Sequence, residues 1–133
     1  MDITQDDLRF LSLLRAAWDG EAGQRAAEAS LRAEPGRAAG RVAAWSLRRS
    51  VEALRCGARR PLAVGTALAP SADEQCLVLA ARCLARGDHA DAAETLRWLA
   101  RTPFAAEVAD RLTEAACAVH GYAAPRRQKA ASA

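Results

Sequence analysis

The sequence has few of the residues that build β-sheets. Only 5% of its 133 residues are aromatic, and β-branched residues are also scarce. A single lysine, Lys129, stands against eighteen arginines. Alanine, the strongest helix former, supplies much of the 51% hydrophobic share. These proportions favour a globular chain over a disordered one. They predict an all-α protein whose core is built from a few large side chains packed over alanine.

The motifs of several enzyme classes are also missing. There is no G-x-S-x-G nucleophile elbow. The stretch "EPGRAAGRV", residues 34–42, lacks the G-K-[ST] and the preceding strand of a phosphate-binding loop. Acidic pairs lie at predicted helix starts, where carboxylates stabilise the helix dipole rather than perform acid–base catalysis. These pairs are Asp6-Asp7 and Asp73-Glu74. We therefore expect a protein that is not an enzyme and uses no cofactor.

The four cysteines form no C-x-x-C pair. Cys76 and Cys83 are seven residues apart, which puts them two turns apart on one helix face, too far for a disulfide. We interpret all four as free thiols packed as small apolar residues. A zinc site would need His89 or His120 close to them, and we expect no metal.

Membrane and export signals are absent as well. No run of 18 apolar residues indicates a transmembrane helix. The start, "MDITQDDLRF", is acidic and lacks the basic region of a signal peptide. We expect a cytoplasmic protein that does not bind membranes.

Start and stop signals divide the chain into five or six helices. Capping boxes begin at Thr4, with Asp7 three residues on, and at Ser71, with Glu74 three residues on. The predicted helices cover about 5–18, 21–33, 38–57, 71–86, 89–101 and 103–120, with stops at Gly20, Pro35-Gly36, Gly87 and Gly121.

These helices should form one antiparallel bundle over 1–121, followed by a flexible basic tail at 122–133. The connector at 59–70 contains Pro61, Gly65 and Pro70, which forbid a long helix. Its Leu62, Val64 and Leu68 suggest that it lies against the body of the protein.

The predicted helix at 38–57 has two distinct faces. One is a core stripe with steps of 3, 4, 3 and 4: Ala44, Leu47, Val51, Leu54 and Ala58. Roughly opposite lie Val42, Trp45, Arg49 and Cys56. Two interpretations stay open at this point. The helix is central and buried on both sides, or Trp45 is an exposed anchor among arginines, as at binding hot spots.

The stretch "GDHADAA", residues 87–93, is predicted to end one helix and begin the next. Gly87 suits the left-handed position after a helix, and Asp88 suits an N-cap. Thr102 and Pro103 suit the start of the last helix in the same way. His89 falls in a first turn and needs no catalytic role. His120, at a helix end, should interact with the terminal carbonyls.

Residues 71–104 resemble a single tetratricopeptide-type helical hairpin. Such repeats often carry a G-D-Y-x-x-A turn, which reads Gly87-Asp88-His89-Ala90-Asp91-Ala92 in this chain. Small or apolar residues flank it at suitable spacings, although His89 replaces the usual aromatic and Pro103 comes one residue early. No second copy is recognisable in residues 1–70. The resemblance implies protein binding through a concave helical surface, as in small bacterial chaperones and adaptors.

Positive charge is concentrated in one segment. Residues 37–60 hold seven arginines and one glutamate, and acids outnumber arginines on both sides. Three interpretations follow from this distribution. Internal pairing would place a basic helix between acidic ones. A protein-interaction module would bind a helical or acidic segment of a partner, either on the Trp45 face of this helix or in the groove made by the last three helices. The predicted partner-binding residues are Val42, Trp45, Arg48, Arg49 and Trp98, and the apolar surface of the helix at 38–57 could also form a homodimer.

The third interpretation is a small nucleic-acid-associated regulator, which we consider the less favoured partner class. Its phosphate contacts would come from Arg41, Arg48, Arg49, Arg55, Arg59 and Arg60, assisted by Arg126, Arg127 and Lys129 of the tail. These arginines are spread around the helix instead of forming one stripe, and few side chains able to read bases accompany them.

Overall fold

Two capping boxes and a left-handed glycine set helix ends in the computed structural model, which describes residues 2–33 and 39–121. Thr4 and Asp7 cap the first helix reciprocally, Ser71 and Glu74 cap the fourth, and Gly87 has φ 84°. The described helices are α1 (Gln5–Trp18), α2 (Glu21–Arg32), α3 (Ala39–Gly57), α4 (Ala72–Ala85), α5 (His89–Leu96) and α6 (Thr102–His120). The predicted all-α class is confirmed, and the described residues contain no strand.

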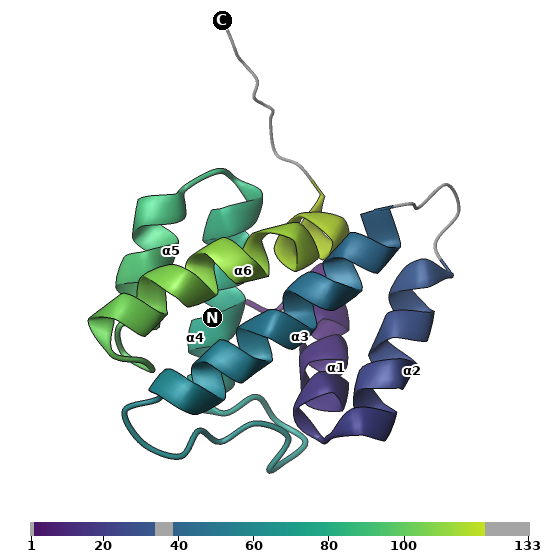
Figure 1. The fold of residues 1–133 in the computed structure, drawn as a ribbon, viewed down its shortest axis with the longest axis horizontal. Coiled ribbons are helices and arrows are strands. Elements are labelled where there is room, and N and C mark those ends of the chain that lie inside the picture. The colour runs from purple at the N-terminus through teal and green to yellow at the C-terminus, as the bar shows by residue number, and fades with distance from the viewer. Residues whose placement is uncertain (1, 34–38, 122–133) are drawn as a thin grey trace, which may run out of the picture.

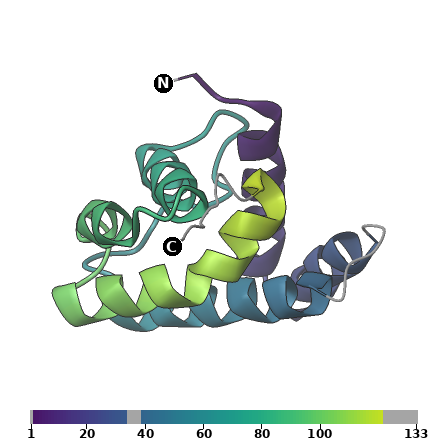
Figure 2. The same cartoon turned by 90° about the horizontal axis from the view of Figure 1, so that it is seen from above.

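The helices pack in two layers. α6 and α3 run side by side across the front of the molecule, and α2 extends this front layer beyond α3 (Figure 1). Seen from above, α1, α4 and α5 lie behind them (Figure 2). The outer face of α3 is therefore left uncovered by the other helices. Within the described ranges, no helix is both long and apolar enough to cross a membrane.

The most extensive helix contact joins α3 to α6, and it depends on small residues. Ser46 Oγ donates to the carbonyl of Arg111 and accepts from the backbone N–H of Ala115 at 3.3 Å. At the other end of α3, Gly57 lies so close to Phe104 that an added Cβ would overlap the ring. The two helices are thus antiparallel. The small residues of α3 form one buried row with steps of 3, 4, 3 and 4: Ala43, Ser46, Ser50, Ala53 and Gly57.

This row corrects the predicted core of α3. Leu47, Val51 and Leu54 are buried as expected, but Ala44 and Ala58 are only half-buried. The prediction missed the small-residue row because serine and glycine carry no hydrophobic signal. They are buried here because they allow two helix backbones to approach closely.

The helix starts after the turn differ from the predictions. Asp88 is the N-cap of α5, but its side chain accepts no capping hydrogen bond and pairs with Arg86 at 3.5 Å. α5 ends at Leu96, earlier than predicted, because the chain bends into a series of turns. Those turns bring Ala100 beside Ala58 in a short antiparallel bridge. α6 begins at Thr102, and Arg101 takes the cap position instead.

The connector between α3 and α4 contains no long helix, as predicted, but it does not lie wholly against the body. Val64 is buried and Leu62 half-buried, whereas Leu68 is 99% exposed. Two expectations lie outside the described residues. These are the helix stop at Pro35-Gly36 and the basic tail, with Arg126, Arg127 and Lys129.

A glycine inside α2 allows it to pack against α1. An added Cβ at Gly23 would overlap the backbone carbonyl oxygen of Ala16. Gly23→Ala should therefore destabilise the protein by about 1–3 kcal/mol, although alanine is the better helix former by about 1 kcal/mol. Urea unfolding measures the difference. Ala26→Gly, at an exposed position of α2, reports the propensity effect alone. A Gly23→Ala variant more stable than the wild type would contradict the close approach.

Candidate functional site

The carboxylate of Asp7 is fully buried at the junction of three helices. Its oxygens accept from the Thr4 backbone N–H at 2.9 Å, from Arg82 Nε of α4 at 3.1 Å, and from Arg82 Nη2. His120 Nε2 of α6 lies 2.9 Å from Asp7 Oδ1, and its ring packs at a tilt against Phe10. The prediction that His120 interacts with the terminal carbonyls of its own helix is therefore wrong. His120 binds a carboxylate of α1 instead. Its Nδ1 is buried without a partner among the described residues.

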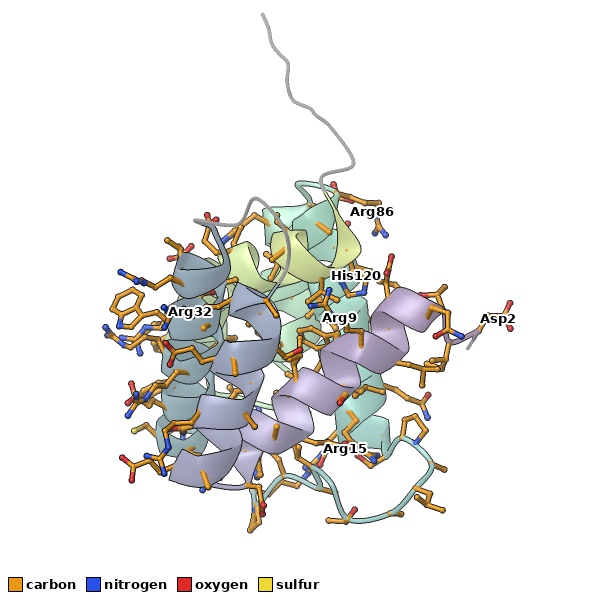
Figure 3. All side chains as sticks on the ribbon, turned by 90° about the vertical axis from the view of Figure 1, so that its right-hand side faces the viewer. Asp2, Arg9, Arg15, Arg32, Arg86 and His120 are labelled. Carbon is orange, nitrogen blue, oxygen red and sulfur yellow. The ribbon has the colours of Figure 1, made fainter. Side chains whose placement is uncertain are left out.

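The carboxylate of Glu74 has an equally complete set of donors. Arg15 of α1 donates through Nε at 2.6 Å and Nη2 at 2.9 Å, and the backbone N–H groups of Ser71 and Gly65 donate at 2.9 and 3.0 Å. The neighbouring Asp73 accepts two hydrogen bonds from Arg60 and one from the Ala63 N–H. In Figure 3, Arg15 lies beside the connector and His120 lies near the start of α1. The acids of the two capping boxes thus tie α1, α4, α6 and the connector together.

These hydrogen bonds keep the acids ionised. Burial alone would raise the pKa of Glu74, but the donors from Arg15, Ser71 and Gly65 outweigh it and lower the pKa to about 2. Burial likewise opposes a lowered pKa at Asp7, where the donors from Arg82, Thr4 and His120 hold it well below its usual range. Enclosed carboxylates whose oxygens are all occupied have no access to a substrate. Both acids therefore act as structural anchors.

The thiols of α4 are poorly suited to nucleophilic chemistry. Burial raises the pKa of Cys76 to about 11 and also raises the pKa of Cys83. All four cysteines are free, as predicted, but the prediction that all four are packed as small apolar residues is wrong for Cys56, which is exposed, whereas Cys117 is buried and the other two are half-buried. No cluster of histidine, cysteine and acidic side chains within residues 2–33 and 39–121 could hold a metal ion.

The outer face of α3 presents the largest aromatic feature of the front layer. Trp45 is 60% exposed and Val42 is 49% exposed. The guanidinium of Arg49, one turn further along, lies 4.9 Å from the centroid of the Trp45 ring and holds it by a cation–π contact. The interpretation in which α3 is buried on both sides is therefore wrong. Trp45 is exposed among arginines, as in the other interpretation. We call Val42, Trp45, Arg48 and Arg49 the Trp45 surface.

A groove runs along each side of Trp45. The first lies between α2 and α3 and has an apolar floor, with polar side chains on its rims. It is lined by Ala17, Glu21, Gln24, Arg25, Ala27, Glu28, Arg41, Ala44, Trp45, Leu47 and Arg48. The second lies between α3 and α6, lined by Val42, Trp45, Ser46, Arg49, Asp110, Arg111 and Glu114. The residues from α2 and α6 were missed because no local motif signals them, and only tertiary packing brings them beside Trp45.

Most arginines of the basic segment have partners within the protein. Arg60 pairs with Asp73, and Arg49 lies 3.3 Å from Glu52. Arg55 stacks on Trp18 and donates to its carbonyl, while Arg59 donates to the carbonyl of Arg97 at 2.7 Å. Carbonyl oxygens and an aromatic face satisfy these guanidiniums as often as carboxylates do. In the described part of the chain, Arg41 and Arg48 contact no carboxylate.

Trp98 is exposed but lies apart from the Trp45 surface. It is 78% exposed in a shallow depression that it shares with Arg59, Glu94 and Arg97. That depression adjoins the C-terminal end of α3, roughly 18 Å along the helix from Trp45 at 1.5 Å per residue. The structure therefore separates Trp98 from the other predicted partner-binding residues.

The buried acids should make stability fall in acid. Because the pKa of Glu74 is lower in the folded protein than its usual 4.5, its stabilising effect is complete above about pH 5 and is lost as pH falls toward 2. Glu74→Gln should lower the free energy of unfolding at pH 7 by about 3 kcal/mol, the low end for breaking a buried ion pair. The substitution should also make the free energy of unfolding less dependent on pH between pH 5 and pH 2, as measured by urea unfolding across that range.

The matched control for this prediction is Glu28→Gln. Glu28 pairs with Arg32 at 3.2 Å on the surface of α2, where nearly half of each side chain is exposed to solvent. Its loss should change stability by less than about 1 kcal/mol at any pH. Equal effects of the two variants would mean that burial of Glu74 adds nothing to its pairing.

Known proteins do not extend these observations. No family model, no curated protein and no solved structure matches the chain. Inferences about function therefore rest on the geometry and charge of the surfaces described above.

Proposed function

We propose that this protein is a non-catalytic interaction module that binds a helical or acidic segment of a partner protein through the Trp45 surface. The observation that carries the proposal is the exposed Trp45, fixed by Arg49 between two grooves. Covering the exposed part of a tryptophan side chain contributes about 3 kcal/mol to binding. A ring already held in place loses little conformational freedom when a partner covers it.

The paired arginines argue against nucleic acid as the principal partner. Of the six arginines that could track phosphates on this segment, Arg49, Arg55, Arg59 and Arg60 already contact groups of the protein itself. Breaking such contacts offsets part of the gain from each phosphate. Arg41 and Arg48 remain, which is too few for a phosphate-tracking surface. They suffice for recognition of one acidic segment.

The tetratricopeptide-type resemblance supports the same class of function. α6 packs against both α4 and α5, as a following helix does when helical hairpins stack. In this proposal the protein is a chaperone- or adaptor-like binder that works in the cytoplasm. Its hairpin stabilises the front layer, and the front layer receives the partner.

Truncation of Trp45 should abolish partner capture. Immobilised protein is exposed to a lysate of the source organism, and retained proteins are quantified by mass spectrometry. Trp45→Ala should reduce the specific partner about tenfold or more, as expected for a hot-spot aromatic residue. Trp98→Ala should have a smaller effect, because Trp98 lies at the other end of α3.

The control is Leu68→Ala, which removes a fully exposed apolar side chain of the connector that lines neither groove. Equal capture by the wild type and the Trp45→Ala variant would rule out the proposed surface. A short random DNA duplex tests the alternative. A complex in light scattering at low salt that is lost at moderate salt would favour the regulator.

A further inference from the structure

The two grooves beside Trp45 differ in charge, and this difference identifies the kind of partner. Resting on the proposed function, we infer that the groove between α2 and α3 receives an acidic amphipathic helix. One apolar side chain of that helix enters the groove beside Trp45. Its carboxylates, two turns apart, pair with Arg41 and Arg48.

The shape of this groove suits a single apolar anchor. Its floor contains Ala17, Ala27 and Leu47, which are buried and present small apolar surfaces. Trp45 lines the groove from the α3 side. An apolar side chain of a partner helix would contact both the floor and the ring, which is the usual anchor in helix-in-groove recognition.

The charges on the α2 rim are already compensated. Glu21 lies 3.8 Å from Arg25, and Glu28 lies 3.2 Å from Arg32. Both pairs join residues four apart on α2, so a partner meets no excess charge of either sign on that rim.

The charges on the α3 rim are not compensated within the described residues. Arg41 and Arg48 are exposed and bracket Trp45, four residues before it and three after it. They are seven residues apart, which is roughly 10 Å along the helix. Acidic side chains at positions i and i+7 of a partner helix have the same separation. An apolar residue between them, at i+3 or i+4, then faces Trp45.

The same charges disfavour a second copy of this chain. A second copy would offer the α3 rim no excess of acid, because the two glutamates that line its own groove, Glu21 and Glu28, are already paired on α2. The groove between α3 and α6 is a weaker candidate for an acidic helix, because Asp110 and Glu114 line it.

A peptide-display selection tests the inference without a known partner. The probe is a library of helical peptides with one central apolar residue and randomised flanking positions, selected on the wild-type protein. Winners should carry Asp or Glu at positions seven apart around the apolar residue. The same selection on Arg41→Glu/Arg48→Glu should return Lys or Arg at those positions.

Affinities of the wild-type winners then separate the two proposals. Arg41→Glu/Arg48→Glu should weaken them about tenfold or more. Arg97→Glu/Arg101→Glu, which changes the net charge equally near Trp98, should leave them unchanged. Glu114→Lys should also have no effect, and a loss there would move the site to the other groove. Winners that need Trp45 but are not acidic would overturn this inference alone. Selected peptides that bind the Trp45→Ala variant as tightly as the wild type would overturn the proposed function as well. A selection that yields no binding peptide would do the same.

Discussion

The arrangement of the helices depends on two buried carboxylates, Asp7 and Glu74, each of which has two roles. At the N3 position of a capping box, each fixes the start of its own helix. Each also accepts hydrogen bonds from an arginine on a different helix. One carboxylate therefore both begins its own helix and joins that helix to a distant part of the chain. Since α1 and α4 are both positioned this way, the layer behind α3 and α6 has little freedom to shift.

This use of charge also explains what remains on the outside. Arginines near the connector and the end of α3 are held by a carboxylate, by carbonyl oxygens or by a ring of the same molecule. The arginines around Trp45 lie at the other end of α3, away from those partners. Among the residues that the structure describes, the front layer consequently presents the exposed Trp45 between two arginines, Arg41 and Arg48, that pair with no carboxylate. This combination is the basis of the binding role that we propose.

The local features of the fold were predictable, and the contacts between helices were less so. Both capping boxes, the stop at Gly87 and the free thiols follow from short-range patterns. The seam between α3 and α6 does not, because its serines and glycine become informative only once a second helix lies against them. His120 was assigned to its own helix end for the same reason, since Asp7 is distant in sequence. For the candidate site, the sequence pattern was compatible with a buried and with an exposed Trp45. The structure shows it exposed, because no other helix covers the outer face of α3 (Figure 1).

The contact between Asp7 and His120 joins residues 113 positions apart. Its formation closes nearly the whole described chain into one loop, so a large loss of chain entropy precedes the stabilising contact. During synthesis α1 leaves the ribosome first, yet it cannot complete its buried carboxylate site until α6 has followed. The apolar face around Phe10 is exposed for that interval. A protein for which we propose binding to other chains thus itself passes through a stage in which α1 lacks one of its own partners.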